Sequence, residues 1–141
     1  MRLFVEKPGM FTTVQDLGRY GCQLQGVPVA GAMDGPALRL GNILLGNGEG
    51  AAALEVTVLG PVLRVEGEGC IAVTGAEAGV TRNGAALETW RVHRLRDSNT
   101  LAFAAPSSGS QTPFLLEPPA ISGPLYTKPP EEGELPARRV L

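Results

Sequence analysis

The most constraining feature of this sequence is the separate placement of its glycines and prolines. Residues 1–105 hold 16 of the 19 glycines and only four prolines, whereas residues 106–141 hold the other eight of the 12 prolines. Glycine supplies the backbone conformations of tight turns, while closely spaced prolines lack the N–H groups on which sheets and helices depend. We therefore expect a turn-rich folded domain over residues 1–105 and a disordered or aberrant proline-rich tail over residues 106–141.

Length and charge limit the class of protein. A chain of 141 residues is long enough for one domain, and 12 Lys and Arg against 14 Asp and Glu leave it nearly neutral. That balance argues against a nucleic-acid partner or a polybasic membrane face. The first residues contain an acidic residue and a proline where a signal peptide needs a continuous apolar stretch, and no apolar run is long enough to span a membrane. We expect a cytoplasmic protein.

The hydrophobic pattern predicts a mainly β fold with one short helix. Asp34 is a suitable N-cap, Pro36 falls in the first turn, and the apolar residues that follow end at Gly46, so we expect a helix over residues 35–45. Asn83-Gly84 predicts a tight hairpin. Many short strands at close spacing favour a closed or nearly closed barrel, because closure removes exposed edges. The strands are expected near residues 3–5, 10–14, 54–58, 62–66, 70–74, 80–82, 86–88, 90–93 and 100–104.

Beyond residue 106 the sequence predicts no regular structure. Phe114-Leu115-Leu116 is the longest apolar run there, and the prolines around it cannot supply ladder hydrogen bonds. The alternative is an ordered arm that packs on the barrel or on a partner.

The two cysteines, the single histidine and the lack of a phosphate-loop motif argue against several chemistries. Cys22 and Cys70 stand far apart without a CxxC spacing, so we expect two free thiols and no bound metal. His93 is followed and preceded by arginines on an expected strand, which favours a solvated basic face over a nucleophile system. No Gly-Lys-Ser/Thr sequence exists, so this chain carries no Walker motif for ATP.

The densest polar cluster lies where an expected strand enters a glycine-rich loop. Gln15, Asp16, Arg19 and Tyr20 could present an amide, a carboxylate and a guanidinium to one carboxylate- or amide-bearing ligand. The equally weighted alternative is that Asp16 and Arg19 pair with each other and fix the loop.

Two further acids have structural interpretations. Asp34 could touch a ligand, but its place before the expected helix favours a capping role. Glu55 alternates with Leu54 and Val56, which favours a solvent-facing side chain over a buried acid.

Several spaced motifs in the first 109 residues resemble the allophanate hydrolase subunit 2 family. That family includes the 5-oxoprolinase subunit named C, the antagonist of the sporulation kinase inhibitor, and the carboxyltransferase region of urea carboxylase. The resemblance rests on segments in the same order as in the family: PGMFTTVQDLGRYG from Pro8, GVPVAGAMD from Gly26, ALRLGN from Ala37, LGN from Leu45, ALEVT from Ala53, GP at Gly60 and VTGA from Val73.

The resemblance implies a cyclophilin-like β-barrel whose active site is shared with a second polypeptide, an allophanate hydrolase subunit 1-type partner. It implies a small amide substrate. That substrate is either 5-oxoproline, which is opened with the use of ATP, or urea, which is carboxylated by carboxybiotin. ATP or biotin would be used by partner subunits or domains, and this chain would bind no cofactor. On the family signature we expect catalytic roles for Gln15, Asp16 and Arg19, and substrate binding by Thr13, Tyr20 and Asp34.

The chain departs from the family in its length and its last segment. Family members continue into a second barrel-like half, whereas Gln111-Thr112-Pro113 begins an unrelated proline-rich sequence. We therefore expect an N-terminal fragment with an out-of-frame or alternative ending, which would be inactive alone because it lacks half of the site. The other hypothesis is a non-catalytic interaction module for a kinase-inhibitor-type partner.

Overall fold

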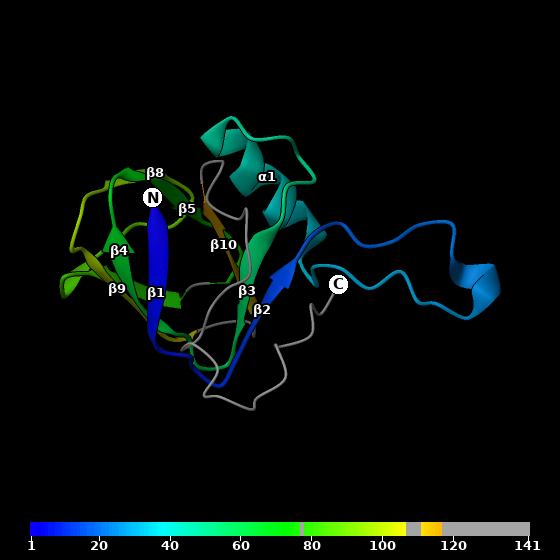
Figure 1. Cartoon of the computed structure of the whole chain (residues 1–141), viewed down its shortest axis with the longest axis horizontal. Coiled ribbons are helices and arrows are strands. Elements are labelled where there is room, and N and C mark those ends of the chain that lie inside the picture. Colours follow the sequence, from blue (N-terminus) through cyan, green and yellow to red (C-terminus); the bar gives the residue numbers. More distant parts are fainter. Residues whose placement is uncertain (77, 107–110, 117–141) are drawn as a thin grey trace, which may run out of the picture.

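The computed structural model describes residues 1–76, 78–106 and 111–116, and side chains are described except at residues 78, 105–106 and 111–116. The described chain forms two five-stranded sheets and one α-helix, with a short 3-10 helix on a protruding loop (Figure 1). The mainly β prediction with a single short helix is confirmed.

The first sheet has the order β1-β4-β9-β6-β7, and all of its pairs are antiparallel. Its strands are β1 (Arg2–Lys7), β4 (Val62–Glu66), β9 (Thr100–Pro106), β6 (Ala78–Arg82) and β7 (Ala85–Ala86). The β6–β7 hairpin turns at Asn83-Gly84, as the sequence predicts.

The second sheet has the order β2-β3-β10-β5-β8, also antiparallel. Its strands are β2 (Phe11–Gln15), β3 (Ala53–Thr57), β10 (Gln111–Leu116), β5 (Gly69–Val73) and β8 (Val92–Leu95). The 3-10 helix η1 (Gln23–Gln25) lies in the loop between β2 and the α-helix.

Two expectations are corrected by this arrangement. Within the described ranges no ladder joins the two sheets, so the barrel is not closed. Residues 111–116 are not an irregular tail but the central strand β10 between β3 and β5. Pro113 removes only one N–H from that strand, and its five neighbours in β10 keep theirs for pairing. The expected disorder of residues 117–141 lies outside the described residues.

A hydrophobic core fills the space between the two sheets. The second sheet contributes Leu54, Ile71, Val73 and Leu95, while the first contributes side chains that include Leu63, Val65, Leu101 and Phe103. Each of these side chains is at most 3% exposed, and such burial contributes about 1.5–3 kcal/mol for each large aliphatic side chain. The core therefore holds the two sheets together where backbone pairing does not.

Helix α1 (Gly35–Leu45) has the bounds that its capping signals predict. The Asp34 carboxylate accepts the N–H of Ala37 at 3.0 Å, and Gly46 ends the helix in a left-handed conformation. The helix lies against β10 and β5 on the outer face of the second sheet (Figure 1). The Thr74 hydroxyl fixes this placement by donating to the carbonyl oxygen of Ala37 at 2.8 Å.

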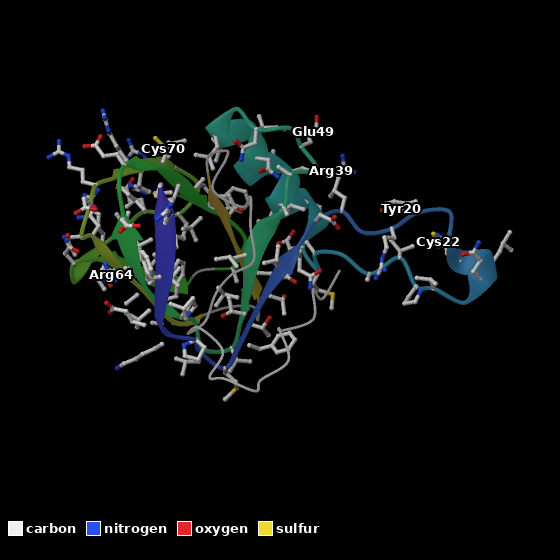
Figure 2. All side chains as sticks on the ribbon, viewed as in Figure 1. Tyr20, Cys22, Arg39, Glu49, Arg64 and Cys70 are labelled. Atoms are coloured by element: carbon white, nitrogen blue, oxygen red, sulfur yellow. The ribbon has the colours of Figure 1, made fainter. Side chains whose placement is uncertain are left out.

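The fully buried side chain of Asn42 ties α1 to the loop that leads into β3. Its amide nitrogen donates to the carbonyl oxygens of Ala51 at 2.8 Å and Glu49 at 3.2 Å. Arg39 reaches the same loop from the solvent side and pairs with the Glu49 carboxylate at 3.1 Å (Figure 2). The two side chains thus bind one loop in a buried and in an exposed setting.

Asn42→Leu should lower the free energy of unfolding by about 2–4 kcal/mol, because two carbonyl groups lose their buried donor. Arg39→Leu, which removes the exposed ion pair to the same loop, should cost about 0–1 kcal/mol. Urea unfolding followed by circular dichroism measures both. Equal losses in the two variants would contradict the buried clamp.

Asp97 joins the turn after β4 to the turn before β9. Its carboxylate accepts the backbone N–H of Gly67 at 2.8 Å and the hydroxyl of Ser98 at 3.1 Å, and these bonds lower the pKa of Asp97. A carboxyl group whose folded pKa is depressed stabilises the fold above its unfolded pKa, about 3.9 for Asp, and this contribution is lost as the pH falls through the folded pKa.

Asp97→Asn should therefore flatten the loss of stability below about pH 4 relative to the unmodified chain. Urea midpoints measured at half-unit steps between about pH 2 and pH 6 test this expectation. The matched control is Glu49→Gln, also at an exposed acid. If Asp97→Asn kept the full acid slope, the Gly67 bond would not contribute to it.

Candidate functional site

The outer face of the second sheet carries two of the predicted site residues, Thr13 and Gln15, together with Glu55. Val14 and Leu54 point into the core, so the alternating positions Thr13, Gln15 and Glu55 point to the opposite face. Thr13 lies directly across from Glu55 in the β2–β3 ladder. This is the face on which Ala53 packs against Leu38 of α1. We call Thr13, Gln15 and Glu55 the polar floor.

Glu55 corrects the expectation of a solvent-facing side chain. It is only 7% exposed, and its Oε1 accepts the backbone N–H of Met33 at 2.9 Å. Strand alternation correctly places Glu55 on the outer face, but the segment that returns to α1 covers that face. A carboxylate this deeply buried requires a donor, and the Met33 amide supplies one.

Thr13 and Gln15 are coupled within the floor. The side-chain amide of Gln15 donates to the Thr13 hydroxyl oxygen at 3.1 Å, and both residues are half-buried. Because the hydroxyl accepts this bond, its own hydrogen can be donated to a ligand. The carbonyl oxygen of the Gln15 side chain and the carboxylate of Glu55 add acceptors beside it.

The structure assigns Asp34 to helix capping. One of its carboxylate oxygens accepts the Ala37 N–H, which confirms the capping interpretation. Met33 precedes it and binds Glu55, so the floor and the first turn of α1 are joined through two consecutive residues. Asp34 thereby positions the segment that covers Glu55.

Asp16 closes the base of a long loop. Its carbonyl oxygen accepts the N–H of Ala32 at 2.8 Å, and its carboxylate accepts the N–H of Gly18 at 2.7 Å. The Arg19 N–H donates to the carbonyl oxygen of Val29 at 2.7 Å. These bonds form a two-stranded neck, and we call residues 19–29 beyond it the arm.

The neck requires glycine at two positions. A Cβ atom on Gly18 would lie 2.2 Å from the Ala30 carbonyl oxygen, and one on Gly31 would lie 2.7 Å from the Gly18 nitrogen. Both glycines have positive φ, at 85° and 101°. The glycine density that predicts a structured loop here therefore serves close approach of the two legs.

The predicted cluster is spread over the floor, the neck and the arm in the structure. Gln15 and Thr13 belong to the floor, and Asp16 forms the neck. Tyr20, 72% exposed, lies out along the arm, away from β2 and β3 (Figure 2). Tyr20 is close to Gln15 in sequence, but the neck separates the two in the structure. Glu55 is distant in sequence and joins the floor through strand pairing.

His93 lies on the far edge strand β8. A ring nitrogen, Nε2, is 2.7 Å from the carbonyl oxygen of Glu88, and the Glu88 carboxylate binds the guanidinium of Arg91. The hydrogen bond that the Arg91 guanidinium donates to the Glu88 carboxylate, together with the charge of Arg91, lowers the pKa of Glu88. The surroundings of His93 are thus an exposed ion pair and a backbone carbonyl.

Cys22 and Cys70 are not joined in a disulfide. Among residues 1–76, 78–106 and 111–116, no three His, Cys, Asp or Glu side chains converge to hold a metal ion. The helices in the same ranges include none that is long and apolar enough to cross a membrane.

The match to a family model and the fold place the chain in the class of carboxyltransferase domains. The family described as carboxyltransferase domain, subdomain A and B, matches residues 25–116, and the chain belongs to this family. The resemblance indicated by the sequence motifs is confirmed. The match reaches beyond residue 109 through β10, so the expected start of unrelated sequence at Gln111 is wrong.

Relatives of this chain are enzyme subunits and multidomain enzymes. It is 37% identical to the Escherichia coli 5-oxoprolinase subunit named C over 111 residues, which cover 78% of this chain and 36% of that protein. It is 36% identical to urea amidolyase of Saccharomyces cerevisiae over 103 residues, covering 72% of this chain and 6% of that enzyme. The chain thus spans about a third or less of these relatives.

Solved structures show the same fold. The crystal structure of the K. lactis urea amidolyase superposes with a TM-score of 0.78 at 33% identity, covering 81% of this chain and 7% of that one. A crystal structure of TTHA0988 gives a TM-score of 0.78 at 31% identity, covering 81% and 24% of the two chains.

Glu55→Leu should reduce the protection of the Met33 amide from hydrogen exchange at least about tenfold, because bonds to charged groups contribute roughly 1.5–3 kcal/mol. Glu55→Gln keeps an acceptor and should retain most of the protection. Exchange measured by NMR at Met33, with the hydrogen-bonded amide of Gly46 at the C-cap of α1 as an internal reference, distinguishes the two. Unchanged protection in Glu55→Leu would contradict the bond.

Proposed function

We propose that this chain forms part of the substrate site of a multi-subunit enzyme acting on a small amide. The observation that carries the proposal is the polar floor, in which a hydroxyl, an amide and a nearly buried carboxylate share one face of β2 and β3. Its relatives, a 5-oxoprolinase subunit and urea amidolyase, by their names act on 5-oxoproline and urea. Both compounds are small amides.

The floor is chemically complementary to an amide. The Thr13 hydroxyl donates to the substrate carbonyl oxygen, while the Glu55 carboxylate accepts a substrate N–H. Gln15 orients the Thr13 hydroxyl through its side-chain amide. Accepting the N–H increases the electron density of the amide nitrogen, which favours carboxyl transfer to it. Donation to the carbonyl oxygen favours attack at carbon.

The other predicted residues act around the floor. Asp16 positions the loop through its neck bonds, and Arg19, at the start of the arm, supplies positive charge for an oxyanion that develops on the substrate. Asp34 positions the Met33 amide through α1. Tyr20 contacts substrate only if a partner brings the arm and the floor together.

ATP or biotin belongs to other subunits or domains in this proposal. The chain has no Gly-Lys-Ser/Thr phosphate loop, and we assign it no step that involves either cofactor. An allophanate hydrolase subunit 1-type protein is the proposed partner, and the cytoplasm is the proposed compartment. ATP-dependent opening of 5-oxoproline is the first candidate reaction, because the E. coli 5-oxoprolinase subunit is covered over 36% of its length and urea amidolyase of S. cerevisiae over only 6%.

A chimera tests this function. Residues 1–116 of this chain replace the matched region of the E. coli 5-oxoprolinase subunit, and ATP-dependent 5-oxoproline turnover is assayed with the other subunits of that enzyme. The chimera should be active, whereas the isolated chain should not. Glu55→Gln and Thr13→Val should each lower kcat/KM by about 10²-fold, as loss of a positioned transition-state hydrogen bond does.

Glu66→Gln is the matched control, because Glu66 is an exposed acid on the other sheet. It should leave turnover unchanged. A folded chimera that assembles with the other subunits but turns over neither 5-oxoproline nor urea favours the alternative, a non-catalytic interaction module. Full activity in Glu55→Gln would remove Glu55 from the proposed site.

A further inference from the structure

The arm is a projection whose tip is not buried by the residues that the structure describes. None of the residues of η1 at its tip is buried, and Leu24 is fully exposed. Tyr20 is 72% exposed, and Figure 1 shows η1 well away from both sheets and from α1. Large apolar side chains gain no hydrophobic stabilisation in this position.

The neck holds the arm in one direction. Asp16 and Arg19 form backbone bonds across it, and Gly18 and Gly31 are in backbone contact. Ordering each residue costs about 1–2 kcal/mol of backbone entropy, which burial of the tip would ordinarily offset. An ordered neck carrying an exposed apolar tip is the arrangement expected of an element that is buried in an interface.

The composition of the arm points to an apolar partner surface. Arg19 is the single charged residue among residues 19–29, whereas the segment contains Leu24, Val27 and Val29. Met33, 73% exposed, adds apolar surface at the base of the neck. Aromatic and large aliphatic side chains of this kind dominate binding energy in protein interfaces.

The lengths of the relatives point to an occupant for this surface. The E. coli 5-oxoprolinase subunit is matched over only 36% of its length, so nearly two thirds of such a protein lies outside the matched region. We propose that the arm docks into that remaining part of a carboxyltransferase protein, with Leu24 and Tyr20 as its apolar anchors. The inference depends on family membership and not on the reaction proposed above.

Co-expression tests the docking. The full chain of 141 residues, carrying an affinity tag, is produced together with the part of the E. coli 5-oxoprolinase subunit that lies outside the matched region. A stoichiometric complex should be recovered with the unmodified chain. Leu24→Asp should reduce its recovery at least tenfold, and Tyr20→Ala at least threefold. Co-expression lets the two pieces fold together.

Val92→Asp is the matched control. Val92 is also an exposed apolar residue, at 45%, but it lies on β8 at the other end of the second sheet from β2. It should leave recovery unchanged, and thermal melting should show that Leu24→Asp alone is as stable as the unmodified chain. A second readout is hydrogen exchange over residues 19–29, which should slow in the complex.

Three results would overturn the proposal. They are no complex with the unmodified chain, equal losses in Leu24→Asp and Val92→Asp, and a dimer of this chain alone that Leu24→Asp dissociates. The last result would make a second copy the occupant. Because no outcome involves turnover, docking and the proposed function can fail separately.

Discussion

The hydrogen bond from the Met33 amide to the Glu55 carboxylate connects the parts of this molecule that matter for function. Glu55 lies on β3, in register with Thr13 on β2, while Met33 ends the loop that carries the arm and precedes the cap of α1. A nearly buried carboxylate is costly without a donor, so this bond fixes where the loop returns to the sheet. The floor, the neck and the first turn of α1 are therefore placed relative to one another by a single side chain.

Elements governed by local chemistry follow from the sequence. Asp34, Pro36 and Gly46 act within one or two turns of chain, and they give the bounds of α1. Asn83-Gly84 specifies its hairpin in the same local way. The fate of Glu55 could not be predicted like this, since alternation determines its face of the sheet but not what covers that face. The covering segment contacts Glu55 through Met33, 22 residues earlier in the chain.

Strand β10 shows a second limit of prediction from sequence, because its local sequence argues against the structure that it adopts. Its sequence contains Pro113 and precedes a proline-rich stretch, so composition argues against a strand. Pairing with β3 on one side and β5 on the other supplies the stabilisation that local propensity lacks. Local sequence is also insufficient for the arm. The glycine density indicates a structured loop but does not predict the direction in which that loop projects.

The position of β10 makes the candidate site depend on the segment that composition assigns to the tail. Pro113 stands opposite Glu55 on one side of β3, and Thr13 stands opposite Glu55 on the other. Strand β3 is therefore held from both sides at the residue that anchors the loop. Without β10, β3 would keep β2 alone, α1 would lose one of the strands that support it, and β5 would keep only β8. A two-stranded remnant is marginally stable in water, so the geometry of the floor requires residues 111–116 as much as it requires Glu55 itself.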